Sequence, residues 1–266
     1  MPHPYLSGTP RPRVLAHRGL VTPEAAARGV VENSRAAMQA AAEAGADHLE
    51  SDCRLTRDGE VVLFHDAELV RVLGDERRVA EATRGELAEL MADRGGLLTL
   101  GEALEAFPRA RFNLDVKAAE AAEPMGRIVA PHAERVLLTS FSERFRIAAL
   151  RAAEAAAGTA GRPATAPGRA ALIRILLATA VGARRRTAGL LAGFDALQIP
   201  ERQGAIRVLS RRLLEAAHRA GVEVHVWTVN DPERMRGLVR FGVDGVVTDR
   251  ADLALDVLEA LGSREP

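Results

Sequence analysis

The sequence predicts an α/β fold, namely a (β/α)8 TIM barrel with a small insertion after the second barrel strand. The length of 266 residues suits one such domain, which commonly contains about 250 residues. With 47% hydrophobic and 27% charged residues, the chain can bury one large core. Short runs rich in Val and Leu alternate with Ala-rich stretches of helical spacing. Because right-handed strand–helix–strand units build a parallel sheet, eight such units predict a closed barrel.

Eight segments have the β-branched or alternating apolar pattern of barrel strands, and the fifth has the weakest pattern. Because most are followed by a helical stretch that can serve as a crossover connection, we expect them to run parallel. The expected strands are Arg13–His17, His48–Arg54, Arg111–Lys117, Arg135–Ser140, Pro163–Thr165, Asp195–Ile199, Glu223–Val229 and Gly245–Thr248.

Residues that favour helix fill the stretches between these strands, and several stretches carry end signals. Asn33 or Ser34 can cap the first helix, which Gly45 can end. Asp231 can cap a later helix, which Gly242 can end. The expected helices are Ser34–Ala44, Glu120–Val129, Glu143–Ala157, Ala170–Val181, Ser210–Ala220, Pro232–Phe241 and Ala251–Leu261.

We expect a single TIM-barrel domain over residues 1–266, with two departures from the regular pattern. Residues 1–12 are rich in proline and polar residues and are predicted to form a loose tail. Residues 58–107 are too long for an ordinary strand-to-helix loop and include a tight turn at Asp58-Gly59 and a strand-like run, Val61–His65. We interpret residues 58–107 as an insertion over the mouth of the barrel, where barrel enzymes place their active sites.

The charge balance argues against several classes of partner. Thirty-six basic residues match 36 acidic ones, so the chain lacks the net charge typical of proteins that bind nucleic acid or anionic membranes. We interpret Arg184-Arg185-Arg186 as a solvated helix end rather than a binding patch. The most apolar helical stretch, Leu172–Ala183, contains Arg174 and is shorter than the ~20 residues of a membrane span, so we expect no stable membrane insertion.

The expected compartment is the cytoplasm. The single cysteine, Cys53, excludes an intramolecular disulfide and a cysteine-rich zinc site, which agrees with a reducing environment. Met1–Arg13 contains no continuous apolar run and therefore does not have the pattern of a secretory signal.

Carboxylates occur at alternate positions of the second and third predicted strands. Glu50 and Asp52 are two residues apart, so the pleat points both to one face, and Asn113, Asp115 and Lys117 repeat this arrangement. Carboxylates that face the barrel interior repel one another unless a cation lies between them, which favours Mg²⁺ or Ca²⁺. Two alternatives stay open: a register slipped by one residue, and a structural ion pair between Asp115 and Lys117.

Two histidines are predicted to approach the mouth of the barrel. His17-Arg18-Gly19 ends the first strand, where the glycine permits close approach of another backbone, and His65 ends the strand-like run of the insertion. Because imidazoles titrate near neutral pH, one can accept a proton while the other donates one. The alternatives are a surface turn for His17-Arg18-Gly19 and an ordinary loop hydrogen bond for His65.

Trp227, the only tryptophan, lies near the end of the seventh predicted strand, on the same face as Glu223 and His225. It either caps the mouth of the barrel or packs in the core. In the first case it is a candidate for substrate binding.

The order of these motifs resembles that of the glycerophosphodiester phosphodiesterase family, over nearly the whole chain from Val14 to Leu258. Any one motif is short, whereas eight in the same order are specific. They are His17-Arg18-Gly19, Glu32-Asn33-Ser34, Glu50-Ser51-Asp52, Leu55-Thr56-Arg57-Asp58-Gly59, His65-Asp66, Asn113-Leu114-Asp115-Val116-Lys117, Trp227-Thr228-Val229-Asn230 and Gly242-Val243-Asp244-Gly245-Val246-Val247-Thr248-Asp249.

The resemblance implies an enzyme that hydrolyses glycerophosphodiesters to sn-glycerol 3-phosphate and an alcohol, with one divalent cation, Mg²⁺ or Ca²⁺. Two features depart from the family pattern. Asp115 replaces the usual glutamate and is one methylene shorter, and the link between Gly19 and Glu32 looks longer than usual. The roles implied are metal ligation for Glu50, Asp52 and Asp115, acid–base catalysis for His17 and His65, and phosphate binding for Arg18 and Lys117.

Two other functions are carried as alternatives. A lysophospholipase D would need an exposed apolar rim for an acyl chain, which Leu69, Val70, Val72 and Leu73 of the insertion offer. A barrel that binds a phosphorylated ligand without turnover would have Asp115 as the mark of a decayed metal site. For the hydrolase, attack by water and attack by the substrate's own glycerol hydroxyl both use the two histidines.

Overall fold

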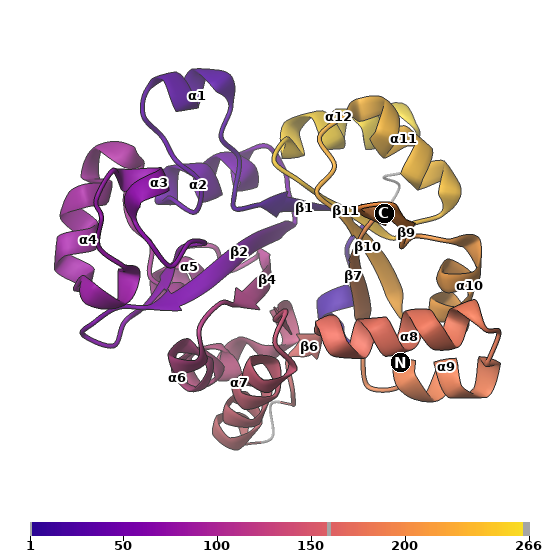
Figure 1. The fold of residues 1–266 in the computed structure, drawn as a ribbon. Helices are drawn as coiled ribbons and strands as arrows, with labels where there is room; N and C mark the ends of the chain where they lie inside the picture. Colours follow the sequence, from indigo (N-terminus) through magenta and orange to yellow (C-terminus); the bar gives the residue numbers. More distant parts are fainter. Residues whose placement is uncertain (1, 159–160, 263–266) are drawn as a thin grey trace.

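Eight parallel strands form a barrel in the computed structural model, which describes residues 2–158 and 161–262 (Figure 1). Their order is β6-β5-β4-β2-β1-β11-β10-β7, and the backbone N–H of Asp195 donates to the carbonyl of Thr165 at 2.9 Å across the seam between β7 and β6. The barrel is nearly closed, as predicted. The strands are β1 (Arg13–His17), β2 (His48–Leu55), β4 (Arg111–Val116), β5 (Val136–Thr139), β6 (Ala164–Thr165), β7 (Ala196–Pro200), β10 (Glu223–Trp227) and β11 (Gly245–Thr248), and a hairpin of β8 (Arg202–Gln203) and β9 (Ile206–Arg207) follows β7.

The side chains of β2 and β4 alternate between the two faces in the predicted register. Asp52 is paired with Asp115 across the parallel ladder. Leu49 and Leu114 belong to the hydrophobic core, which also includes residues of the surrounding helices. Because successive side chains of a strand point to opposite faces, Glu50, Asp52 and Asp115 lie on the inner face. A register slipped by one residue is therefore excluded.

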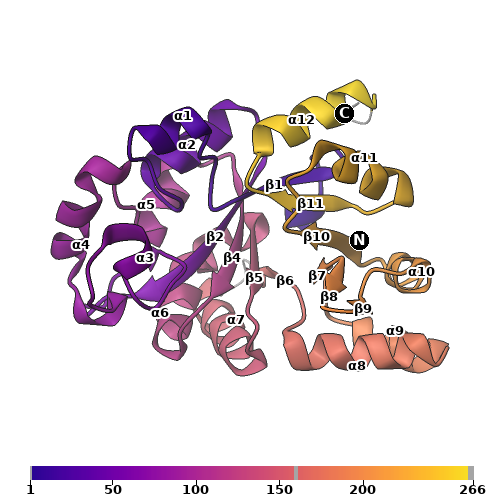
Figure 2. The same cartoon turned by 45° about the horizontal axis from the view of Figure 1, so that its top comes forward.

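A layer of helices covers the outside of the barrel (Figures 1 and 2). Each predicted helix is present, with both ends within one residue of the expected ends. Within the described residues, no helix is both long and apolar enough to cross a membrane. This layer contains α2 (Arg35–Glu43), α5 (Leu100–Ala106), α6 (Ala119–Val129), α7 (Glu143–Ala157), α8 (Arg169–Ala180), α10 (Arg211–Arg219), α11 (Pro232–Phe241) and α12 (Ala251–Ala260), and a 3-10 helix, η4 (Ala130–Arg135), follows α6.

Outside residues 58–107, two helices of the described residues were not expected, α1 (Pro23–Ala27) and α9 (Arg184–Leu191). Gly182, with a φ of 72°, lies between α8 and α9 and separates them. Arg184, Arg185 and Arg186 therefore lie at a helix end and are exposed, as interpreted, but this end is the beginning of α9. The helix dipole does not favour positive charge there.

The cap of α2 is Ser34, whose Oγ accepts a hydrogen bond from the backbone N–H of Ala37 at 3.2 Å. Asn33, the other candidate cap, has a positive φ of 58° and turns its side chain toward β2. There its Oδ1 accepts a hydrogen bond from the hydroxyl of Ser51 at 2.7 Å. Asn33 thus links the start of α2 to the strand that carries the carboxylates.

Residues 58–107 form two parts rather than one insertion. The first part has its own small apolar cluster, which includes Val62, Phe64 and Leu87. The second part is α5, whose Leu100 and Leu104 join the main core, so α5 is an outer helix of the barrel. The departure from the regular barrel therefore ends before α5. It comprises β3 (Val61–Leu63), which pairs antiparallel with β2, then α3 (Val70–Leu73), η2 (Val79–Glu81), α4 (Arg84–Met91) and η3 (Ala92–Arg94).

The N-terminal segment is packed against the barrel and differs from the loose tail expected over residues 1–12. Tyr5 and Leu6 of η1 (Pro4–Leu6) are buried in a cluster with Ala196. The Tyr5 ring meets the His48 ring edge-on, with centroids 5.3 Å apart. Because His48 and Ala196 begin their strands, this segment covers the N-terminal end of the barrel. The C-terminal end remains for the functional site.

Candidate active site

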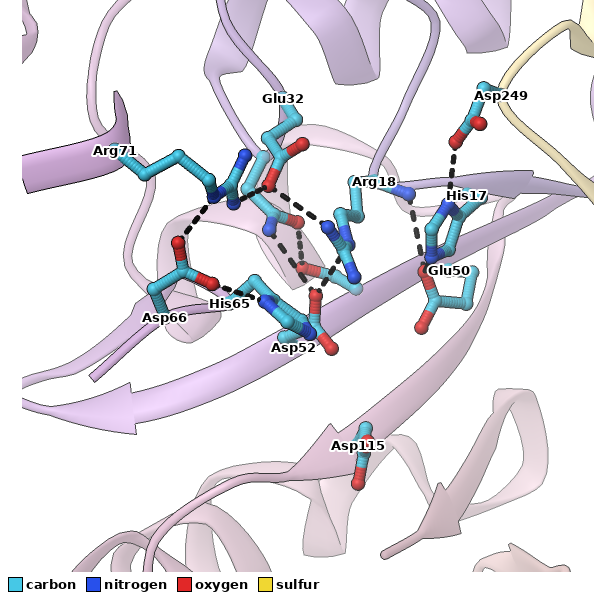
Figure 3. A network of polar contacts seen from close by, with 12 residues as sticks. His17, Arg18, Glu32, Glu50, Asp52, His65, Asp66, Arg71, Asp115 and Asp249 are labelled. Carbon is cyan, nitrogen blue, oxygen red and sulfur yellow. Dashed lines mark hydrogen bonds and ion pairs between the residues drawn. The ribbon is translucent and has the colours of Figure 1, made fainter. Parts of the chain in front are cut away.

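The polar residues predicted to carry chemistry gather at the C-terminal end of the barrel (Figure 3). His17 is the last residue of β1, and Glu50 and Asp52 lie in β2. Asp115 lies in β4, and Lys117 follows that strand directly. The parallel strands therefore bring together side chains that are far apart in the sequence.

The turn after β1 requires a glycine. Gly19 has a φ of 88°, and a Cβ atom at this position would lie 2.6 Å from the backbone carbonyl carbon of Ala37. The close backbone approach that Gly19 was expected to permit is thus present, and the approaching backbone is that of α2. It allows the backbone N–H of Arg18 to donate to Glu50 Oε2 at 3.2 Å.

His17 is oriented by a carboxylate at the end of β11. Its Nδ1 lies 2.6 Å from Asp249 Oδ1, and Asp249 Oδ2 accepts a hydrogen bond from Asn230 Nδ2 at 2.6 Å. An ionised carboxylate can only accept, so Nδ1 carries the proton and Nε2 is directed toward Glu50 Oε2, 3.9 Å away. Burial lowers the pKa of His17, but the hydrogen bond to Asp249 and the charge of Glu50 outweigh it, so the pKa lies above the ordinary 6.5.

His65 has an equivalent partner. Its Nδ1 lies 2.5 Å from Asp66 Oδ1, while the guanidinium of Arg71 binds both Asp66 and Glu32. Burial raises the pKa of Asp66, but the hydrogen bonds from Arg71 and His65 outweigh it and lower the pKa to about 2. Asp66 is therefore ionised, and it sets the proton of His65 on Nδ1 in the same way.

Two cations hold the central carboxylate, Asp52. Arg18 Nε lies 2.9 Å from Asp52 Oδ2, and Lys117 Nζ lies 2.9 Å from Asp52 Oδ1. Lys117 Nζ is also 2.6 Å from Asp115 Oδ2, so this ammonium bridges β2 and β4. Burial raises the pKa of Asp52, but Lys117 and Arg18 outweigh burial and lower it. The ion pair between Asp115 and Lys117 that we considered from the sequence is thus formed.

Glu50 and Asp115 are less well compensated. Burial, together with the charge of Asp52, raises the pKa of Glu50 to about 8. Burial is also the main reason why the pKa of Asp115 is raised, and Asp115 Oδ1 is buried without a hydrogen-bond partner in the described residues. Three buried carboxylates with an unused oxygen are a donor set that suits Mg²⁺ or Ca²⁺. In the described residues, however, no three His, Cys, Asp or Glu side chains are close enough together to hold a metal ion.

A pocket of about 400 Å³ opens beside His17 and Arg18. Glu32 and Arg71 form its polar wall, and Asp249 lies at its edge next to His17. Its apolar lining consists of Val21, Val30, Val31 and Val72. Part of this lining comes from the link after Gly19 and part from α3, the two regions that we expected to shape the mouth.

Trp227 lies at the end of β10 and is only partly buried. Its ring is edge-on to the ring of Phe141, with centroids 6.1 Å apart, and Lys117 Nζ lies 5.5 Å from the Phe141 centroid. Phe141 is 59% exposed. Of the two positions considered for Trp227, these contacts favour the mouth of the barrel over the core.

Several residues of this site were not among the sequence candidates. Asp249 follows the last barrel strand directly, which is the same signal that identified His17. Asp66 is adjacent to His65 and was quoted only as part of a motif. Arg71 lies in the insertion, where no periodic pattern pointed to it. Phe141 directly follows the fourth predicted strand, so the signal that fits Asp249 could also have identified it.

The sequence pattern of the Glycerophosphoryl diester phosphodiesterase family matches residues 17–253. A "Probable glycerophosphodiester phosphodiesterase 2" of Mycobacterium tuberculosis is 36% identical over 264 residues, which cover 96% of this chain and 97% of that protein. The solved glycerophosphodiester phosphodiesterase of Thermotoga maritima has a TM-score of 0.68 at 27% identity, over 92% of this chain and 97% of that one. A phosphodiesterase of Oleispira antarctica, solved with the product sn-glycerol-3-phosphate, has a TM-score of 0.66 at 21% identity, over 94% and 97%.

The fold is a (β/α)8 barrel with polar groups gathered at its mouth, and the relatives that it matches over nearly their whole length are named phosphodiesterases. The chain belongs to the glycerophosphoryl diester phosphodiesterase family, as its order of motifs predicts.

Proposed function

We propose that this enzyme hydrolyses glycerophosphodiesters to sn-glycerol 3-phosphate and an alcohol, with His17 and His65 as the acid–base pair. One observation carries the proposal: each histidine has its Nδ1 held by an ionised carboxylate, which leaves its Nε2 for proton transfer. The sn-glycerol-3-phosphate complex of the Oleispira antarctica structure supports the choice of product.

The two histidines differ in their electrostatic surroundings. Because the pKa of His17 is raised, more of its imidazole is protonated near neutral pH than at the ordinary pKa of 6.5. This suits a general acid that protonates the leaving alcohol oxygen. His65 then accepts the proton of the attacking hydroxyl, whether that belongs to water or to the glycerol of the substrate. In either route the proton balance closes, because one imidazole gains the proton that the other loses.

The cations of the site suit a phosphate. Arg18 and Lys117 both contact Asp52, and the phosphodiester would bind the donors of these two side chains that Asp52 does not use. These donors stabilise the negative charge that builds on the phosphoryl oxygens. The exposed ring of Phe141, next to Lys117, and the partly buried ring of Trp227 offer an apolar wall for the carbon skeleton of the substrate.

Glu50, Asp52 and Asp115 would hold the divalent cation, Mg²⁺ or Ca²⁺, once their side chains move closer together than they lie in this structure. When bound, the cation would neutralise charge on a phosphoryl oxygen and polarise it. The raised pKa of Glu50 and the unpartnered Asp115 Oδ1 support this assignment, because a cation would compensate both. The ammonium of Lys117 would then turn from Asp115 toward the substrate.

The test is release of sn-glycerol 3-phosphate from glycerophosphocholine by the purified protein, before and after EDTA and with Mg²⁺ or Ca²⁺ added back. We expect turnover that EDTA abolishes and one of the two cations restores, and that His17→Ala and His65→Ala abolish. His218→Ala is a matched control, because His218 Nε2 also binds a carboxylate, Asp244, at 2.7 Å, but on α10. Turnover that survives in His17→Ala refutes the acid–base assignment, and turnover that is insensitive to EDTA refutes the metal assignment.

A lysophospholipase D is a second candidate, favoured by the exposed apolar side chains of Val70 and Phe141. The same assay with lysophosphatidylcholine distinguishes the two, since the lipid enzyme turns it over faster than glycerophosphocholine. Binding of either compound without turnover under both cations would instead indicate a barrel that binds phosphorylated ligands.

A further inference from the structure

One long segment of the chain carries only positive charge. Residues 155–194 contain six arginines and no aspartate or glutamate, in a chain whose net charge is zero. This segment includes α8 and α9, which pack against each other on the outside of the barrel (Figures 1 and 2). Arg162 is paired with Asp195 at 2.7 Å. The other five are exposed and form no ion pair with a described residue: Arg169, Arg174, Arg184, Arg185 and Arg186.

A row of large apolar side chains lies on α8 beside these arginines. Ile173, Leu177 and Val181 are spaced four residues apart, so they share one face of the helix. They are 46%, 63% and 80% exposed, and they make up three of the seven exposed large hydrophobic side chains of the described residues. An uncovered apolar row flanked by arginines is typical of helices that lie in a membrane interface.

The start of α9 adds to the positive potential. Its first turn contains Arg184, Arg185 and Arg186, no acidic residue and no side-chain cap. The N-terminal end of a helix carries a partial positive charge, which these arginines reinforce instead of balancing.

A groove connects the apolar row with the arginines. It is lined by the end of α8, the start of α9 and the facing side of α10, and Val181 and Arg184 both contribute to it. Arg212 lines the opposite side, where its Nη1 donates to the carbonyl of Ala180 at 2.8 Å. Among the lining residues in the described chain, Glu215 is the only acidic one. The end of the apolar row and the first arginine of α9 thus meet in this groove. We call the exposed side chains of the apolar row and the five arginines together the α8–α9 face.

We propose that the α8–α9 face docks the protein on the surface of a membrane that contains anionic lipids. The arginines match the headgroup charge, while Ile173, Leu177 and Val181 enter the boundary between headgroups and acyl chains. A second copy of the chain across a two-fold axis would bring arginines against arginines, which is repulsive. Nucleic acid would attract the arginines but would leave the apolar row exposed to water.

The test is sedimentation of the full-length protein with vesicles of phosphatidylcholine alone or with about 30% phosphatidylglycerol, at low and at high salt. We expect binding only to the anionic vesicles, and weaker binding at high salt. Each arginine near an anionic surface strengthens binding about fivefold, so R184Q/R185Q/R186Q should weaken it about 100-fold. Leu177→Ser should weaken it about tenfold through lost apolar burial.

The matched control is R109Q/R151Q/R240Q, which removes the same charge from exposed arginines elsewhere and should bind like the unmodified protein. Thermal melting and hydrolysis of soluble glycerophosphocholine should be unchanged in all of these variants. Vesicle binding does not require turnover, so the docking and the proposed reaction succeed or fail separately.

Three results would overturn the proposal. The first is no binding of the unmodified protein to anionic vesicles at low salt, and the second is an equal loss in both triple variants. The third is that the α8–α9 face has another occupant, either duplex DNA bound in preference to vesicles or a dimer in solution that Leu177→Ser dissociates.

Discussion

Replacing Asp249 tests how the protein orients His17. Asp249 Oδ1 accepts the Nδ1 proton of His17 at 2.6 Å, while Asp249 Oδ2 accepts from Asn230 at 2.6 Å. A hydrogen bond to a charged group contributes about 1.5–3 kcal/mol. Because Asp249 is half-exposed, we take the lower part of this range, about 1.5–2 kcal/mol. Asp249→Ala should therefore lower kcat about 10–30-fold, with little change in KM, since Asp249 acts through His17.

Asp249→Asn should be more damaging than Asp249→Ala, although it changes the shape less. The amide oxygen of the variant would keep the hydrogen bond from Asn230, so its NH2 group would face His17 Nδ1 and donate to it. Nδ1 would then be an acceptor, so His17 would be neutral with its proton on Nε2, and the amide would oppose the doubly protonated imidazolium that a general acid needs. We expect kcat to fall about 10²–10³-fold, within the range by which acid–base groups contribute.

The assays are steady-state kinetics with glycerophosphocholine and ¹⁵N NMR of the imidazoles, which reports the tautomer of His17 directly. Asp249→Glu, which keeps the carboxylate, should recover part of kcat. Asp244→Asn is the control for losing a His–Asp pair, because Asp244 binds His218 on α10. The reasoning fails if Asp249→Asn retains the kcat of the unmodified enzyme, or if His17 has the same tautomer in Asp249→Asn and in the unmodified enzyme.

Two predictions concern stability. Gly19→Ala should destabilise the protein by about 2–4 kcal/mol in thermal denaturation, because Gly19 has a φ of 88° and the added Cβ would overlap the backbone of Ala37. Gly45→Ala is the control, since Gly45 has a φ of 95° and an added Cβ there would meet no atom within 4 Å. It should cost only about 1–2 kcal/mol. Glu223 is buried and paired with Arg13 at 2.8 Å. Burial raises the pKa of Glu223, but its hydrogen bonds with Arg13 and His225 outweigh burial and lower the pKa from 4.5 to about 2. A carboxylate with a lowered pKa in the folded state stabilises the protein above pH 4.5, and this stability is lost as the pH falls toward 2. About 3 kcal/mol of unfolding free energy should therefore disappear in this window, as measured by urea unfolding at each pH. Glu223→Gln should lack this loss. Equal losses in the two glycine variants, or the same acid dependence with and without Glu223, would contradict these arguments.

The alternation within each strand and the periodicity of each helix are local properties, and the sequence alone determined them. Glu50 and Asp52 lie on one face because the pleat has a period of two residues, wherever β2 is placed in the fold. Gly19 marks a turn for an equally local reason, since few other residues adopt a positive φ. These local rules, with the order of the motifs, were enough to predict the barrel and most of the polar residues at its mouth.

The partners of those residues depended on the closure of the barrel. His17 and Asp249 are 232 residues apart, and they meet because β1 pairs with β11. The burial of Tyr5 likewise requires the open N-terminal end of a barrel, so a segment that looks loose in the sequence becomes packed. No periodic pattern encodes such contacts, because each needs several strands to be in place first.

The content of charged residues is likewise a property of the sequence, whereas their distribution over the surface is a property of the fold. The sequence contains equal numbers of basic and acidic residues, and a sum over the chain indicates no charged partner. Folding places the arginines of residues 155–194 next to Ile173, Leu177 and Val181 on one outer face, while most acidic groups lie elsewhere. The sequence determined which side chains exist and which face of a strand or helix carries them. The tertiary structure decided which of them meet, because electrostatic interactions depend on distance in space and not on separation along the chain.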